Sequence, residues 1–278
     1  MKFSKMQGAG NDYVYVNCFE EKIDFDISKA AIKISDRHFG RGSDGMVLIC
    51  PSDKADFEMI MYNSDGSRAE MCGNAVRCVG KYVYDKGLTD KDTITVETLA
   101  GIKTLQLSTE NGKVKTVRVN MGAPVLVPKD IPVNSDKERF IDETVNVGGI
   151  DYKVTCVSMG NPHAVVFLDT LDGLDIEKTG PLFENHSLFP RRINTEFVEV
   201  IDRHTLKMRV WERGAGETLA CGTGSCASMV AAVLLAKAEN KATLKLLGGD
   251  LVIEWAGEGS DVFMTGPAEF VFDGEIQI

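Results

Sequence analysis

The chain has no polybasic cluster and no long apolar run, and these absences exclude several classes of function. Thirty-one basic residues are outnumbered by 41 acidic ones, and the net charge of −10 would repel nucleic-acid backbones and anionic membranes. The longest apolar stretch, residues 229–236, is far too short to span a bilayer, and the N-terminus lacks the apolar core of a signal peptide. We therefore expect a soluble, cytoplasmic protein without nucleic-acid or membrane partners.

Metal and cofactor motifs are missing as well. The four histidines are scattered, no Cys-x-x-Cys occurs, and no glycine pattern for a nucleotide or lysine motif for pyridoxal phosphate is present. At 100° per helical residue, Cys72 and Cys78 would lie about 240° apart, so they share no face. We expect neither a metal nor a cofactor. Seven cysteines, an odd number, fit a reducing cytosol better than a disulfide framework. Five of them are interpreted as small buried hydrophobic residues: Cys18, Cys50, Cys78, Cys156 and Cys226.

The chain does contain an internal sequence repeat. Cys72 and Cys221 lie 149 residues apart (221 − 72), and each precedes a glycine, a small polar residue and an apolar run typical of a helix. Gly10-Asn11 before a strand is echoed by Gly160-Asn161. An apolar strand ten positions before each cysteine also recurs, at 57–63 and 206–212. Three features in the same order indicate two domains of like topology.

Short β-branched and aromatic runs bounded by turn residues dominate the rest. They predict strands at 13–16, 46–49, 57–62, 93–98, 103–107, 114–119, 154–157, 164–168, 196–201, 205–211, 243–247, 251–255 and 262–265. Asn111-Gly112 and Gly248-Gly249 predict hairpin turns. Helices are expected at 28–36, 73–85 and 222–239. This balance favours the α+β class.

The helix at 222–239 is apolar on nearly every face, so strands must surround it. The helix at 73–85 has a narrower apolar stripe, with Arg77 and Lys81 on its other faces, and is expected to lie in a similar place. Residues 122–124 and 128–142 mark the domain boundary. We therefore divide the chain into domains 1–121 and 122–266.

A cysteine at a helix N-terminus suits chemistry on an acidic substrate. The free N–H groups and the helix dipole favour negative charge, so they can lower a thiol pKa to roughly 3.5–7.5 or hold a substrate carboxylate. One such cysteine could be a nucleophile, a redox thiol or a cap. Two from related domains suggest a thiolate and a thiol on opposite faces of one carbon, which can remove and return a proton with inversion.

Six sequence blocks together resemble the diaminopimelate epimerase family. They are residues 8–12, 61–67, 71–74, 159–163, 191–196 and 211–224 without residue 219. The resemblance implies two domains, each a mixed or antiparallel barrel-like sheet around a central helix, with residues 267–278 returning to the first. It also implies a homodimeric isomerase, without cofactor, that interconverts LL- and meso-diaminopimelate in lysine and peptidoglycan-precursor biosynthesis.

Carried over by position, the resemblance implies a set of site residues. Cys72 and Cys221 would be the two catalytic bases, and His163 and Glu212 would tune their pKa values. The substrate would be bound by Asn11, Asn63, Gly73, Asn74, Asn161, Asn194, Glu212, Arg213, Gly222 and Thr223. Arg213 suits a carboxylate and Glu212 an ammonium group. Two positions depart from the family: Gly45 replaces a frequent Gln contact, and Phe272 replaces a frequent Tyr of the dimer contact.

Two other functions fit the paired cysteines. A proline racemase or hydroxyproline epimerase would use the same chemistry on an amino acid with one head group, and Asn63, Asn194 and Arg213 weigh against it. A redox-sensing protein would instead join Cys72 and Cys221 in a reversible disulfide without catalysis. Exchange of solvent deuterium into the α-position of diaminopimelate separates the enzyme from the sensor.

Overall fold

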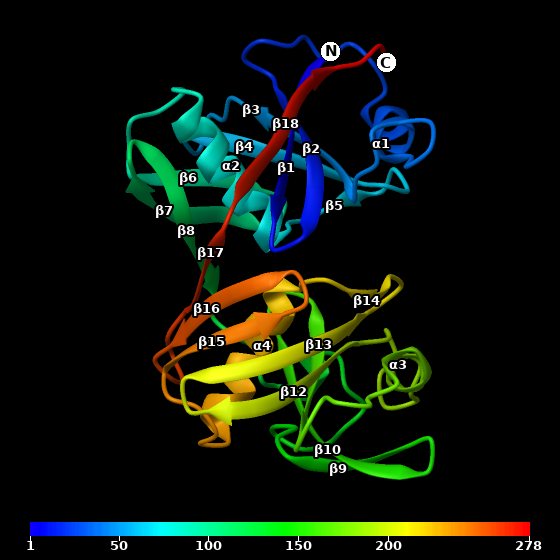
Figure 1. Cartoon of the computed structure of the whole chain (residues 1–278). Helices are drawn as coiled ribbons and strands as arrows, with labels where there is room; N and C mark the ends of the chain where they lie inside the picture. The colour runs from blue at the N-terminus through cyan, green and yellow to red at the C-terminus, as the bar shows by residue number, and fades with distance from the viewer. The chain divides into compact units, whose positions relative to one another are not determined.

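The computed structural model describes residues 1–278, and the chain folds into two compact units (Figure 1). Unit 1 comprises Met1–Asn120 and Thr265–Ile278, and unit 2 comprises Met121–Met264. Both termini belong to unit 1, where the N–H of Ile276 donates to the carbonyl of Met1 over 3.0 Å. No helix of the chain has the length and apolar character needed to cross a membrane.

The strands of unit 1 are β1 (Lys2–Gly8), β2 (Asn11–Asn17), β3 (Gly45–Cys50), β4 (Phe57–Asn63), β5 (Arg68–Ala69), β6 (Thr93–Thr98), β7 (Gly101–Glu110), β8 (Lys113–Gly122) and β18 (Glu269–Glu275). Its helices are α1 (Ile27–Ser35) and α2 (Gly73–Asp85). Both β8 and the later β17 run through the boundary between the units.

Unit 2 contains β9 (Glu143–Val147), β10 (Ile150–Ser158), β11 (Pro162–Leu168), β12 (Asn194–Asp202), β13 (Thr205–Glu212), β14 (Gly216–Thr218), β15 (Lys241–Leu246), β16 (Gly249–Trp255) and β17 (Val262–Pro267). Its helices are α3 (Ile176–Glu184) and α4 (Gly222–Leu234), with a 3-10 turn, η1, at Pro128–Asp130.

The two units pair their strands in the same order. In unit 1 the order β1-β2-β3-β4-β6-β7 is antiparallel, parallel, antiparallel, parallel and antiparallel. In unit 2 the order β10-β11-β12-β13-β15-β16 repeats that sequence of directions. β18 pairs antiparallel with β1 and so extends the sheet of unit 1. The α+β class predicted from the sequence is confirmed.

In each unit the sheet curls around one helix (Figure 1). α2 packs against β1, β2 and β7, and α4 packs against β10, β11, β12, β15 and β16. Nearly every residue of α4 is buried, because its apolar side chains extend around the whole helix. α2 is also almost fully buried, and Arg77, expected on a polar face, is 0% exposed. Its guanidinium donates to the carbonyls of Gly73 and Pro267.

Two helix predictions were wrong in detail. α3 was not predicted, because Gly180-Pro181 looks like a helix break; in the structure Pro181 lies inside the helix. Gly180 packs so closely on Trp211 that a Cβ atom would lie 2.3 Å from the indole. α4 was predicted to reach residue 239 but ends at Leu234, because Ala236 adopts a left-handed φ of 55° that stops the helix.

The turn predictions hold within one residue. Asn111 and Gly112 both have positive φ, 52° and 73°, which a two-residue hairpin between β7 and β8 requires. The second hairpin turns at residues 247–248, because Gly249 already belongs to β16. Turn residues therefore specified these two hairpins locally.

The interpretation of Cys18 and Cys50 as simple buried hydrophobic residues was wrong. They are partly exposed and joined by a disulfide, with their Cα atoms 4.9 Å apart. Cys18 directly follows β2 and Cys50 ends β3, and these neighbouring strands are parallel. The disulfide forms because β2 and β3 are adjacent in the sheet. The number of cysteines in the sequence does not reveal which strands are adjacent.

Stability should fall at alkaline pH because Cys78 is buried in α2. Burial raises the pKa of Cys78 to about 11. As the pH rises above the unfolded thiol's pKa of about 8.5, the unfolded chain loses a proton that the folded chain keeps, so the free energy of unfolding decreases. We expect a contribution of roughly 1.4 kcal/mol per pH unit between about pH 9 and 11. Urea unfolding of wild type and Cys78→Ala measures it; equal pH slopes for the two proteins would contradict it.

Candidate active site

Cys72 is the residue immediately before α2 in unit 1. It adopts an extended conformation (φ −132°, ψ 123°) as the N-cap, so Gly73 and Asn74 form the first turn. The first N–H groups of a helix lack intrahelical partners and carry the positive end of its dipole. The Cys72 thiol is partly exposed and donates to Asn11 Oδ1 over 3.2 Å. The fold thus brings Asn11, Cys72, Gly73 and Asn74 together, as predicted.

Asp44 holds Asn11 in place, although Asp44 was not among the residues predicted for the site. Its Oδ2 accepts from Asn11 Nδ2 over 2.7 Å and from the backbone N–H of Asp12 over 3.0 Å. Because the amide nitrogen of Asn11 is held by Asp44, its oxygen is available to Cys72. Burial raises the pKa of Asp44, and the charge of Asp12 adds to the shift. The sequence feature that could have identified Asp44 is its position next to Gly45. That segment drew attention only because Gly45 replaces a Gln that is frequent in the family.

Gly45 and Asn63 occupy paired positions on β3 and β4. A Cβ atom on Gly45 would lie 2.1 Å from the carbonyl oxygen of Tyr62, so the backbone leaves no room for any side chain there. A side chain at position 45 would therefore require the neighbouring strand to move. The amide of Asn63 donates to Ser67 Oγ over 3.0 Å, within the turn before β5.

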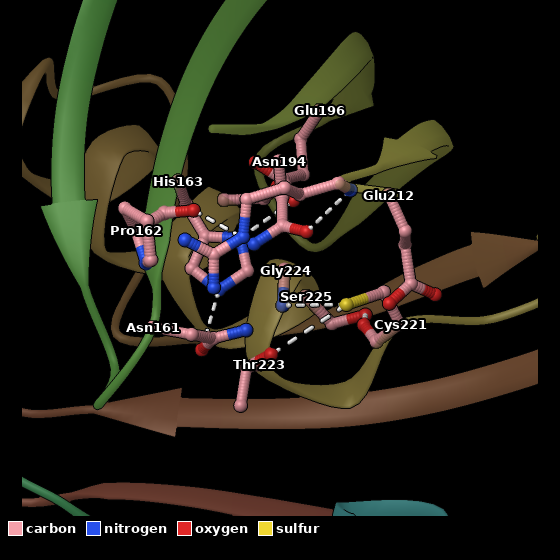
Figure 2. Close-up of polar contacts among 12 residues, drawn as sticks. Asn161, Pro162, His163, Asn194, Glu196, Glu212, Cys221, Thr223, Gly224 and Ser225 are labelled. Carbon is pink, nitrogen blue, oxygen red and sulfur yellow. Dashed lines mark hydrogen bonds and ion pairs between the residues drawn. The ribbon is translucent and has the colours of Figure 1, made fainter. Parts of the chain in front are cut away.

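Cys221 is the N-cap of α4 in unit 2, equivalent to Cys72 in unit 1. Its conformation is also extended (φ −117°, ψ 110°), and Gly222 and Thr223 begin the helix. The N–H of Gly224 donates to Cys221 Sγ over 3.3 Å, and Thr223 Oγ1 lies 3.5 Å from the same sulfur (Figure 2). The residue is only 5% exposed, so its sulfur is well screened from water.

The expectation of a lowered thiol pKa is wrong for Cys221. Burial raises its pKa well above the ordinary value, and the charges of Glu212 and Glu196 raise it further. The hydrogen bonds from Thr223 and Gly224 favour the thiolate but do not outweigh these effects. The surroundings of Cys221 therefore favour the protonated thiol over the thiolate.

Glu212 is the last residue of β13, and Figure 2 shows its side chain beside Cys221. It accepts a hydrogen bond from the hydroxyl of Thr218, and its charge acts on the neighbouring Cys221 thiol. Burial raises the pKa of Glu212, while the hydrogen bond from Thr218 and the charge of His163 lower it. The carboxylate is therefore placed to receive the proton of the Cys221 thiol.

His163, on β11, is completely buried between two oxygen atoms. Its Nδ1 lies 2.7 Å from Glu196 Oε1, and its Nε2 lies 2.9 Å from Asn161 Oδ1. Glu196 is on the adjacent strand β12 and is also 0% exposed. The sequence analysis treated Glu196 only as a strand residue, because nothing in a strand pattern marks a charged residue as buried.

Asn194 and Arg213 are linked to each other. Asn194 Oδ1 accepts from the backbone N–H of Arg213 over 2.9 Å, and its Nδ2 donates to the carbonyl of Pro162 over 2.8 Å. The amide thus ties β11 and β12 to the residue after β13. The Arg213 side chain is exposed and donates to the carbonyl of Arg191 over 3.0 Å. Figure 2 shows this pair of strands in the same region of unit 2 as Asn161, His163, Glu212, Cys221 and Thr223.

The chain contains no group of three or more His, Cys, Asp or Glu side chains arranged to hold a metal ion. Each unit instead presents one cysteine at a helix N-terminus, with an amide from the preceding strand region and a carboxylate nearby. Such an arrangement binds anions and transfers protons.

Comparisons with known proteins agree on one family. The family model described as diaminopimelate epimerase matches residues 3–127 and 155–271. A diaminopimelate epimerase of Acetivibrio thermocellus is 64% identical over 278 residues, covering 100% of this chain and 99% of that protein. A diaminopimelate epimerase of Methanococcus maripaludis is 61% identical over 280 residues, and the match covers 100% of this chain and 100% of that protein.

The fold is shared more widely. A crystal structure of a hydroxyproline epimerase from Agrobacterium vitis, with bound trans-4-hydroxy-L-proline, superposes with a TM-score of 0.69. The superposition covers 99% of this chain and 91% of the hydroxyproline epimerase chain. The sequences are only 15% identical, so this similarity supports the fold alone.

Proposed function

Because this chain belongs to the diaminopimelate epimerase family, we propose that it interconverts LL- and meso-2,6-diaminopimelate without a cofactor. The observation that carries the proposal within the structure is the equivalence of Cys72 and Cys221. Each is an extended N-cap residue before a buried central helix. The reaction is an isomerisation that serves lysine and peptidoglycan-precursor biosynthesis.

The proposed mechanism uses the two sulfurs as base and acid. A thiolate removes the α-proton and becomes a thiol, and the other thiol protonates the opposite face of the carbanion and becomes a thiolate. The centre is inverted, no covalent intermediate forms, and the reverse reaction uses the same groups in exchanged roles. We assign protonation of the substrate to Cys72 and abstraction to Cys221 in one direction.

Stabilisation of the carbanion falls to the two helix N-termini. As the α-carbon loses its proton, negative charge moves into the substrate carboxylate. The backbone at Gly73, Asn74, Gly222 and Thr223 would hold that carboxylate, because N–H groups fixed before the reaction stabilise developing charge without reorganising.

The second head group of diaminopimelate requires its own partners. The exposed guanidinium of Arg213 suits a carboxylate bidentately, and a carboxylate such as Glu212 suits an ammonium group. Amide groups both donate and accept, and Asn11, Asn63, Asn161 and Asn194 would supply them. Asn194 already donates and accepts within unit 2, so we assign it mainly to holding Arg213.

The proposal is tested by incubating the purified protein with LL-diaminopimelate in D2O and following stereochemistry and α-deuterium by NMR. Formation of the meso isomer with deuterium uptake supports it. A parallel incubation with L-proline addresses the racemase alternative: turnover of proline alone would overturn the assignment. A redox sensor has no reason to exchange either α-proton.

We also propose a cytoplasmic homodimer that uses the surface of β18. Val271 and Phe272 are 56% and 43% exposed and adjacent on this strand, and two neighbouring apolar side chains in contact with water support an association surface there.

Phe272→Lys should convert the dimer to a monomer, because it places a charge in the apolar contact. Sedimentation equilibrium of the wild type and the variant measures the change. Leu99→Lys alters an apolar residue outside β18 that is 55% exposed, more than Phe272, and should leave the dimer intact. A wild type that sediments as a monomer would contradict the proposal.

A further inference from the structure

A buried carboxylate lies behind the active-site histidine. Glu196 and His163 are both 0% exposed, and Glu196 Oε1 is 2.7 Å from His163 Nδ1. Removing a carboxylate from water costs several kcal/mol unless a partner compensates for it. Glu196 Oε2 has no hydrogen-bond partner, so this carboxylate does not cross-link the fold. The contact between Glu196 Oε1 and the His163 ring is therefore the interaction that can compensate for burying this carboxylate.

The Glu196 carboxylate also borders the first turn of α4. A Cβ atom on Gly224 would lie 2.5 Å from Glu196 Oε1 and 3.2 Å from Cys221 Sγ. Glycine at this position therefore lets the carboxylate lie under the helix turn that carries the thiol. Figure 2 shows Glu196, His163 and Asn161 in a row, with Nε2 of the ring 2.9 Å from Asn161 Oδ1.

We propose that Glu196 is a positioning residue that fixes the orientation and the tautomer of His163. This inference rests on the proposed function, because it assigns His163 to the proton chemistry of that site. The carboxylate accepts the Nδ1–H, and the ring nitrogen that faces the site is therefore Nε2. A His163 ring held in this way can carry or release a proton at Nε2 without turning.

The charge of the surroundings makes the pairing necessary. The titratable groups that interact with Glu196 and His163 are Glu212 on β13, Cys221 at the start of α4 and Cys156 on β10. All three are acids, so none of them supplies a positive charge to the buried Glu196 carboxylate. The His163 ring is the group in hydrogen-bond contact with it.

Glu196→Gln tests the proposal because Gln keeps an acceptor oxygen and removes only the charge. We expect kcat to fall about 10- to 100-fold with KM unchanged, since Glu196 supports a functional histidine and is not assigned to the substrate. Thr195→Val is the matched control. Thr195 is the buried neighbour on β12, and its hydroxyl also has no partner, so its loss should leave kcat unchanged.

A direct readout is 15N NMR of histidine-labelled protein, with the His163 signals assigned by their loss in His163→Gln. In the wild type we expect a protonated Nδ1, and in Glu196→Gln the Nδ1 signal should shift because the carboxylate no longer accepts that proton. An unprotonated Nδ1 in the wild type, or identical spectra for both proteins, would overturn the proposal. The wild-type spectrum decides even if the variant does not fold. It is also independent of diaminopimelate turnover, so failure of the proposed function is recognised separately.

Discussion

Cys72→Ala and Cys221→Ala should each lower kcat for epimerisation by at least about 10²- to 10⁴-fold, the usual contribution of a positioned acid or base. Inversion requires removal of a proton from one face and its return on the other, and the proposed mechanism assigns one face of the carbon to each sulfur. Loss of either thiol should therefore stop the interconversion in both directions. Initial rates from LL- and from meso-diaminopimelate, measured by NMR in D2O, test this expectation.

The controls for this experiment lie in the same helices. Cys78 and Cys226 are fully buried thiols in α2 and α4, and neither is assigned to the chemistry. Cys78→Ala and Cys226→Ala should cost some stability and leave kcat near that of the wild type. Cys72 makes no side-chain capping bond, so its replacement should leave the fold intact. Full activity in Cys72→Ala or Cys221→Ala would refute the two-base mechanism.

The internal repeat was the most predictive feature of the sequence. α4 begins 149 residues after α2 (222 − 73), and α3 begins 149 residues after α1 (176 − 27). The same offset that revealed the paired cysteines would also have placed α3 from the expected helix at 28–36. Local reasoning failed there because Gly180-Pro181 suggests a break, whereas the packing of Gly180 on Trp211 stabilises the helix.

The supporting carboxylates could not be predicted in the same way. Asp44 acts through Asn11, and Glu196 through His163, and both contacts join neighbouring parallel strands. A strand pattern shows which face a residue occupies but not which strand lies beside it. The disulfide between Cys18 and Cys50 was missed for the same reason.

The electrostatics of Cys221 show why residue type and helix position are insufficient to predict a pKa. The helix N-terminus was expected to lower it, but burial and two carboxylates raise it. Abstraction of a substrate proton therefore needs a group that first takes the thiol proton. Glu212, whose side chain lies beside Cys221 in Figure 2, is the carboxylate in position to do so.

Glu212→Gln distinguishes two roles that predict opposite changes in rate. If Glu212 receives the proton of Cys221, the variant should lose about 10²- to 10⁴-fold in kcat. If its charge only raises the pKa of Cys221, removing the charge lowers that pKa, and activity should increase and extend to lower pH. We expect the loss. Glu217→Gln, which breaks the ion pair with Arg209 on the next strand, is the matched control and should retain kcat.

The pH dependence of the Thr218→Val variant is a second test of Glu212 as the acceptor of the Cys221 proton. The hydroxyl of Thr218 donates to Glu212 and lowers the pKa of that carboxyl. Without it the pKa of Glu212 rises, so a higher pH is needed to ionise the proton acceptor. The acidic limb of the kcat profile should therefore move to higher pH, while the rate at the plateau stays near that of the wild type. An acidic limb at the wild-type position would show that ionisation of Glu212 does not control the reaction.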